Sequence, residues 1–481
     1  MKWPRVLLIA EAANPEQASV PLVGWSHYDA LRRVADVHLV TQIRNRDALQ
    51  RRGLMAGVQF TAIDSEAVAA TMAQVGLWLR GSEQHGWTTA TALKTIAYYY
   101  FEHLVWRTCA RRLADGEFDL VHRVTPLSPV TPSMMAQKCK QIGVPFVLGP
   151  LNGGLRWPKQ FGELRRRERE WLAGWRRLHT LLPAHASTRN AASAILIGSK
   201  AALDSIHARL WEKCVYLPEN AVESERVRKE VPAECNNPLQ VVFAGRLVPV
   251  KGVDMLLEAA APLITSGSLR LTIIGDGPER VPLEALGRKR QLGSQLAFRG
   301  WRAREVYEAL GESDIFAFPS VKDFGGGAVL EAMAVGLAPI VIGYGGPAEL
   351  VTPETGYIVP LGDRTAVIAG LRRSLAEAIE KPQSLLARRR AALDRARALF
   401  TWDVKAQQVL DVYRWVLGEL TSKPSFGFFG SRSDDLMYAS VDVAGRDAAG
   451  SNWRQGRASS KEARGVCASR GRDSTASSRG R

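Results

Sequence analysis

The stretch VVFAGRLVPVKG, residues 241–252, joins a short apolar run to a Gly-Arg pair and then a Lys-Gly pair. A continuous apolar run of this length is typical of a buried parallel strand, and the glycine at its end lets the chain turn sharply. Residues 253–261 then have the pattern of a helix. The stretch therefore predicts a strand, a loop and a helix, with two cations, Arg246 and Lys251, in the loop.

The same alternation continues in both directions from this stretch. Short apolar runs that alternate with helical segments predict doubly wound parallel sheets, so the expected fold class is α/β with two Rossmann-like domains. The expected domains are 1–230, 231–400, a helix in 401–423 and a disordered tail in 424–481. The expected strands are 6–10, 37–41, 120–121, 144–148, 194–197, 241–244, 271–274, 295–298, 315–318 and 339–342, and the expected helices are 20–33, 88–113, 132–141, 253–261 and 328–335.

The composition narrows the class of protein. Of the 481 residues, 46% are hydrophobic and 23% are charged, which argues against a wholly disordered chain. No apolar run approaches the roughly 20 residues that span a bilayer, and five cysteines without a CxxC pair favour a reduced, cytoplasmic protein without a metal site. The net charge of +16 indicates an anionic partner: nucleic acid, a membrane surface or a polyphosphate-bearing substrate.

A second stretch, PSVKDFGGGAVLEAMA at residues 319–334, carries the chemistry. Gly325, Gly326 and Gly327 precede a predicted helix, whose free amides form a ready site for phosphate. Asp323 and Glu331 lie eight residues apart around this site. Since carboxylates beside a phosphate need hydroxyls or cations, sugar and ribose hydroxyls are their expected partners.

These residues resemble the donor-binding domain of the retaining glycosyltransferases called family 4, which have the GT-B fold. The resemblance rests on the Gly-Arg and Lys-Gly pairs, on Ile-Gly-Asp-Gly-Pro at 274–278 and on Leu-Glu-Ala-Met-Ala at 330–334. It covers about residues 1–420 and is stronger after 240. It implies two domains that face a cleft and a C-terminal helix, opened by Thr401-Trp402, that returns to the first domain.

The resemblance also implies roles for single residues. Arg246 and Lys251 would hold the donor diphosphate, Asp323 the donor sugar and Glu331 the ribose. His122, at the end of a first-domain strand, would lie near the donor sugar and assist the transfer. Asp323 departs from the family pattern, which has glutamate here, followed one residue later by Phe-Gly. The remaining donor-binding residues would be Gly245, Gly275, Asp276, Gly277, Gly325, Gly326 and Gly327, and the acceptor-side residues Asn152, Gly153 and Gly154.

The implied reaction is transfer of a hexose from a nucleotide diphosphate sugar to an acceptor hydroxyl, in the synthesis of a polysaccharide, glycolipid or other envelope glycan. No tightly bound cofactor and no metal ion are expected. The acceptor would be a glycan or a lipid-linked molecule. Residues 157–182 combine arginines with tryptophans, a pattern that predicts a helix on the anionic inner face of the membrane or, alternatively, a solvated basic helix.

Other interpretations remain open at this stage. The same fold could serve a nucleotide-sugar epimerase or a phosphorylase-like enzyme. The charge alone would also suit a nucleic-acid-binding protein without catalytic activity, although no RRM, KH or helix-turn-helix pattern is present and no specific nucleic acid is expected. Asp323 could be a helix cap, His122 a core histidine and Asn152 a turn former.

Overall fold

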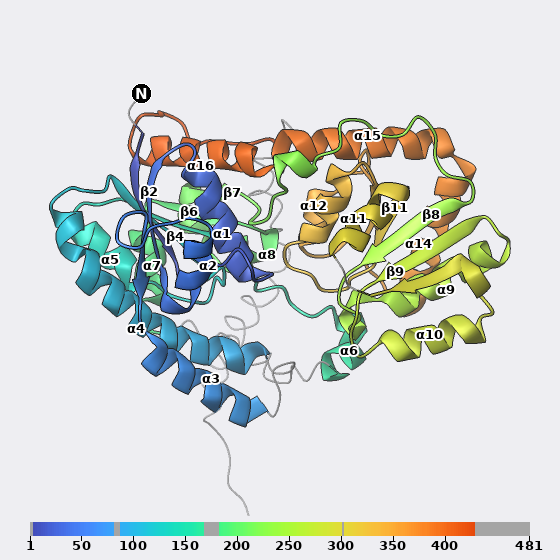
Figure 1. The fold of residues 1–481 in the computed structure, drawn as a ribbon, viewed down its shortest axis with the longest axis horizontal. Coiled ribbons are helices and arrows are strands. Elements are labelled where there is room, and N and C mark those ends of the chain that lie inside the picture. The colour runs from blue at the N-terminus through green and yellow to red at the C-terminus, as the bar shows by residue number, and fades with distance from the viewer. Residues whose placement is uncertain (1–2, 81–86, 168–181, 301–302, 429–481) are drawn as a thin grey trace, which may run out of the picture. The chain divides into compact units, whose positions relative to one another are not determined.

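The computed structural model describes residues 3–80, 87–167, 182–300 and 303–428 (Figure 1). Most of the basic segment 157–182 and residues 429–481 of the expected tail lie outside these ranges. Within them the strands form two parallel sheets, and helices connect successive strands. The predicted α/β class with two Rossmann-like domains is confirmed.

The first sheet contains seven described strands in the order β3-β2-β1-β4-β5-β6-β7. β1 pairs in parallel with both β2 and β4, so the strand order reverses between β1 and β4. The central strand β4 is buried along its whole length, including its polar residues His122, Arg123 and Thr125. The strands are β1 (Arg5–Ala10), β2 (Asp36–Gln42), β3 (Phe60–Ile63), β4 (Leu120–Thr125), β5 (Phe146–Leu151), β6 (Ala194–Ile197) and β7 (Cys214–Tyr216).

The second sheet contains six described strands in the order β10-β9-β8-β11-β12-β13. β8 pairs in parallel with β9 on one side and β11 on the other, so here the order reverses between β8 and β11. In sheets of this kind ligands bind beyond the carboxyl ends of the strands at the point of reversal. The strands are β8 (Leu239–Ala244), β9 (Leu269–Ile274), β10 (Leu296–Arg299), β11 (Ile315–Phe318), β12 (Ala338–Ile342) and β13 (Tyr357–Val359).

The helices pack against the strands and against one another. Several begin at a side chain that caps the first turn: Thr401, for example, accepts the amide of Val404 at the start of α16. The main helices are α1 (Val20–Leu31), α2 (Arg46–Arg51), α3 (Glu66–Arg80), α4 (Trp87–Ala114), α5 (Met134–Gln141), α6 (Gly162–Arg167), α7 (His185–Ala191), α8 (Lys200–Leu203), α9 (Val253–Thr265), α10 (Arg280–Lys289), α11 (Ala303–Glu312), α12 (Gly327–Ala334), α13 (Gly346–Leu350), α14 (Arg364–Glu380), α15 (Pro382–Leu399) and α16 (Trp402–Val416).

The last helix, α16, returns to the first domain as the resemblance implied (Figure 1). Its Trp402 and Ala406 pack with Ala30 of α1 in a buried cluster. The rings of His27 and Trp402 pack edge to face, with 5.1 Å between their centroids. The two domains are therefore joined twice, by the chain that precedes β8 and by α16.

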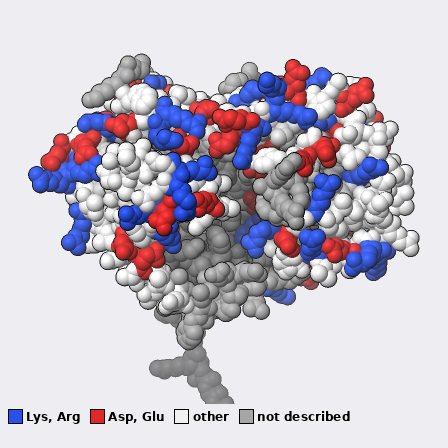
Figure 2. Space-filling view, viewed as in Figure 1, with Lys and Arg blue, Asp and Glu red and all other residues white. Residues whose placement is uncertain are grey.

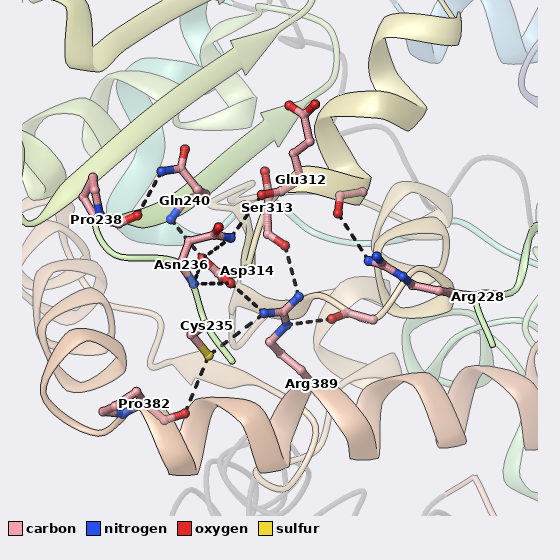
Figure 3. Close-up of polar contacts among 12 residues, drawn as sticks. Arg228, Cys235, Asn236, Pro238, Gln240, Glu312, Ser313, Asp314, Pro382 and Arg389 are labelled. Atoms are coloured by element: carbon pink, nitrogen blue, oxygen red, sulfur yellow. Dashed lines mark hydrogen bonds and ion pairs between the residues drawn. The ribbon is translucent and has the colours of Figure 1, made fainter. Parts of the chain in front are cut away.

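A buried ion pair joins α15 to the second sheet (Figure 3). Arg389 donates from Nη1 to Oδ1 of Asp314 at 2.6 Å, and both side chains are almost fully buried. Asp314, directly before β11, also accepts the backbone amides of Asn236 and Gln240. Arg389 additionally donates to the carbonyl of Gly336. One carboxylate thus organises the start of the second domain.

The chain does not become a tail at residue 424 as expected. The Phe428 side chain is 3% exposed and packs against Tyr216 and Phe400, with ring centroids 5.3 and 5.6 Å apart. Its carbonyl accepts a hydrogen bond from Arg395 of α15. The expected boundary was wrong because the polar composition of the following residues concealed two phenylalanines that supply apolar surface.

The surface charges are mixed on the face drawn in Figure 2, where Lys and Arg side chains alternate with Asp and Glu. The net charge of +16 does not form one continuous basic patch on that face. Among the described helices, none is both long and apolar enough to cross a membrane.

Candidate active site

The loops that follow β8 and β11 meet at the reversal point of the second sheet. The amide of Val321 donates to the carbonyl of Val250 at 3.0 Å. The ammonium group of Lys251 forms an ion pair with Asp323 and lies 4.7 Å from the ring centroid of Phe318. Two residues that lie 72 positions apart in the sequence are therefore in direct contact where a ligand is expected.

Asp323 also organises the glycine loop. Its Oδ1 atom accepts the amides of Gly325 and Gly326, each at 3.3 Å, immediately before α12 begins at Gly327. Asp323 thus holds the loop before α12 and pairs with Lys251; it is not the helix cap that one interpretation allowed, because the N-cap residue of α12 is Gly326. The sequence had assigned Lys251 to a diphosphate and Asp323 to a sugar, and had not predicted their mutual contact.

Gly275 and Gly277 support the loop that carries Gly245 and Arg246. A Cβ atom on Gly275 would lie 1.9 Å from the carbonyl oxygen of Gly245, so only glycine fits. Asp276 accepts the Gly277 amide with its own side chain. Arg246 is exposed and forms no ion pair with any residue in the described ranges.

Glu331 lies in a separate group from Lys251 and Asp323. Burial raises the pKa of Glu331, and the nearby charge of Arg226 acts in the opposite direction. Arg226 lies 4.9 Å from the ring centroid of Tyr307 and donates to its hydroxyl. The sequence did not predict Arg226 or Tyr307 as neighbours of Glu331, because both lie outside the motifs.

His122 is a core residue in this structure. Its ring is fully buried: Nε2 donates to the carbonyl of Gly149 at 2.7 Å, and Nδ1 accepts from the hydroxyl of Tyr413 at 2.6 Å. Burial lowers the pKa of His122 to about 4, so the ring is neutral. The expected catalytic role does not fit this geometry, since neither ring nitrogen is left for a sugar. The ring instead links β4 to α16.

The acceptor-side residues lie directly after β5. The Asn152 side chain is 7% exposed, and its Oδ1 atom accepts the amide of Gly153 at 2.7 Å. Gly154 follows, and the loop then reaches the second domain, where the carbonyl of Arg156 accepts from the hydroxyl of Tyr344 at 2.7 Å. Trp157 lies 4.5 Å from the ammonium group of Lys322.

Glu349 forms a second contact between the domains that the sequence did not predict. Both of its carboxylate oxygens accept the amide of Lys200, at 3.0 and 2.9 Å, and Oε2 also accepts the hydroxyl of Tyr216. Burial raises the pKa of Glu349 to about 7. The hydrogen bonds from Lys200 and Tyr216 stabilise the ionised form and act in the opposite direction, but they are weaker than the effect of burial.

The Glu349→Gln variant is expected to lose one pH dependence of stability. In the unfolded chain the carboxyl group has its ordinary pKa of 4.5, so between pH 4.5 and about 7 the folded protein holds a proton that the unfolded chain has released. Wild-type stability should therefore fall relative to the variant across that window and level off above it. Thermal unfolding of both proteins from pH 4 to 8 measures the difference, and a constant gap would contradict it.

The part of the chain that matches a known protein family is essentially the second domain. Residues 225–391 match the family model described as glycosyl transferases group 1. A GDP-mannose-dependent alpha-mannosyltransferase of Mycobacterium tuberculosis is 34% identical over 185 residues, 38% of this chain and 44% of that protein. A D-inositol 3-phosphate glycosyltransferase of Corynebacterium efficiens is 29% identical over 233 residues, 47% and 53% of the two chains. The chain thus spans about half the length of these curated relatives.

Solved structures resemble a larger part of the chain. Anabaena HepE in complex with UDP has a TM-score of 0.56 at 17% identity over 85% of this chain and 100% of that one. Sucrose-phosphate synthase from Thermosynechococcus elongatus has a TM-score of 0.57 at 15% identity over 87% and 100%. These similarities cover most of the chain, and the fold of this chain is the GT-B fold.

Proposed function

We propose that this protein is a retaining glycosyltransferase of family 4 that moves a hexose from a nucleotide diphosphate sugar to an acceptor hydroxyl. The observation that carries the proposal is the contact of Lys251 with Asp323 beside the Gly325 and Gly326 amides. It lies at the reversal point of the second sheet and inside the stretch that matches the group 1 model.

In the proposed reaction these groups stabilise the departing diphosphate. Lys251 supplies a positive charge, Arg246 supplies a second one from the same loop after β8, and the amides at the start of α12 supply donors. Because Asp323 already accepts these amides and pairs with Lys251, the donor must exchange with the Asp323 carboxylate for some of these partners. The freed carboxylate is then available to a hydroxyl of the sugar.

The proposed acceptor is a glycan or a lipid-linked molecule that reaches the loops of the first domain. Asn152 to Gly154 lie in one of these loops, and residues 11–19, between β1 and α1, form another. We further propose a cytoplasmic protein that works at the inner face of the membrane. The basic segment thought to mediate this, residues 157–182, lies mostly outside the described residues.

A specific nucleotide sugar is expected to raise the unfolding temperature. A ligand at 100 times its dissociation constant stabilises the folded state by about 2.7 kcal/mol. A thermal-shift panel of UDP-, GDP- and ADP-sugars tests this, followed by detection of the released nucleoside diphosphate with candidate acceptors. If no member of the panel shifts the transition or is consumed, the proposed function is wrong.

A further inference from the structure

Glu219, which follows β7, is a buried carboxylate that lies outside the motifs of the second domain. Its side chain is 4% exposed. The backbone around it is held from two directions: the carbonyl of Pro218 accepts from the ammonium group of Lys405, and the carbonyl of Glu219 accepts from Nε2 of His27 at 3.2 Å. The backbone that carries this carboxylate is therefore held by α16 and α1.

The carboxylate lies between the ends of two loops, one from each domain. A Cβ atom on Gly325 of the glycine loop would lie 2.0 Å from Oε1 of Glu219, and a Cβ atom on Gly198, after β6, would lie 2.9 Å from Oε2. Asn220 donates to Oε1 at 2.9 Å. Glu219 thus brings a first-domain carboxylate directly against the loop assigned to the diphosphate.

Two buried polar atoms at this place, Oε2 of Glu219 and Nδ2 of Asn152, make no hydrogen bond of good geometry within the described ranges. The Asn152 amide still acts on the Glu219 carboxylate, so the two groups face each other without a well-formed bond. The Cβ atom of Asn152 lies 3.3 Å from the position that a Cβ atom on Gly198 would take. The side chains of Glu219 and Asn152 therefore lie next to the same small space above Gly198. A buried polar atom without a partner costs about 1–3 kcal/mol, and a poorly aligned contact between the two groups leaves part of that cost uncompensated.

The charges around Glu219 agree with this geometry. Burial raises the pKa of Glu219, while the Asn152 amide and the Lys405 charge lower it and the Asp323 charge raises it further. The group is therefore a strong hydrogen-bond acceptor held close to a second carboxylate. A phosphate would be repelled from this place, and a cation would gain nothing from the amide donor of Asn152.

We propose that Glu219 and Asn152 form a subsite that binds one hydroxyl of the transferred sugar, with Glu219 as a specificity-determining residue. The proposal rests on the proposed function. A hydroxyl group donates one hydrogen bond and accepts others, so it matches the acceptor Oε2 and the donor Nδ2 at once. The contact of the carboxylate with Gly325 favours the sugar next to the diphosphate over the acceptor.

The test compares two ligands of the full-length protein by calorimetry: the nucleotide sugar that stabilises the wild type and the matching free nucleoside diphosphate. The Glu219→Ala variant should bind the nucleotide sugar about 10- to 100-fold more weakly, the range expected for a lost hydrogen bond to a charged group. Its affinity for the free diphosphate should change less than about threefold. The isosteric Glu219→Gln variant, which keeps an acceptor oxygen, should recover part of the loss.

Sugar donors that lack single hydroxyls identify the contact. One deoxy donor should bind wild type more weakly but bind the Glu219→Ala variant no worse than the complete donor does. An equal loss for the free diphosphate would mean that Glu219 only supports the glycine loop, and a change confined to the KM of the acceptor would assign the hydroxyl to the acceptor. Either result, or unchanged affinity for all ligands, overturns the proposal.

Glu102 provides a matched control. It is also a buried carboxylate, but it accepts from Tyr98, Ser133 and the amide of Met134 in the first domain. The Glu102→Gln variant reports the general effect of removing a buried carboxylate and should not discriminate between the two ligands. If wild type binds no nucleotide sugar at all, the proposed function itself fails, which is a different result from wild-type binding that survives substitution of Glu219.

Discussion

Replacement of Lys251 with alanine is expected to lower the turnover number by about 100- to 1000-fold, the usual effect of removing one group that stabilises charge in a transition state. Lys251 is only partly exposed and lies over Phe318, so the charge is held in a setting that screens it poorly. The substitution removes the cation at the point where a diphosphate would depart. It also leaves Asp323 beside the glycine loop without its partner.

Steady-state kinetics with the best nucleotide sugar from the thermal-shift panel would measure this effect. The Lys251→Arg variant keeps the positive charge on a side chain of different shape. Its turnover number should lie between those of wild type and the Lys251→Ala variant. Lys289, exposed at the end of α10 in the same domain, is a suitable control because its replacement by alanine changes the net charge equally. Turnover by the Lys251→Ala variant above a third of the wild-type value would exclude the assigned role.

The Asp314→Ala variant is expected to lose about 3–5 kcal/mol of stability, because it leaves the buried guanidinium of Arg389 without its counter-charge. The amides of Asn236 and Gln240 lose an acceptor as well. Urea unfolding followed by tryptophan fluorescence measures the change in the free energy of unfolding.

Two further variants make this result decisive. The double variant Asp314→Leu with Arg389→Met removes both charges and should be closer to wild type than the single variant. The Asp394→Ala variant breaks an exposed pair with Arg397 and should change stability by less than about 1 kcal/mol. If the Asp314 and Asp394 substitutions lowered the free energy of unfolding equally, the buried ion pair would be no more important for stability than the exposed one.

The fold could be predicted from the sequence because most strands are continuous apolar runs. Each strand expected in the second domain corresponds to an observed one within two residues. The strands that were missed, β3, β7 and β13, contain three or four residues each. So short a segment carries no periodicity, and its pairing is determined by the neighbouring strands in the sheet.

The candidate site was predictable only in part. Motif residues such as Lys251 and Asp323 come together because two strand ends meet at the reversal point. Contacts between distant segments leave no such pattern: Glu219 stands in a short Pro-Glu-Asn sequence, and only the fold brings it against Gly325. For His122 the sequence suggested a site residue where the structure has a buried one. A strand residue can point inward or outward, and the sequence did not reveal Tyr413 as its partner.

Phe428 has a practical consequence for anyone shortening this protein. A truncation after residue 423, chosen by composition, would remove an aromatic ring that fills the space between Tyr216 and Phe400. The loss would weaken the seam at which Tyr216 meets Glu349. Expression plasmids and affinity tags should therefore retain every residue through 428, and a stop codon placed five positions earlier should yield a less soluble product.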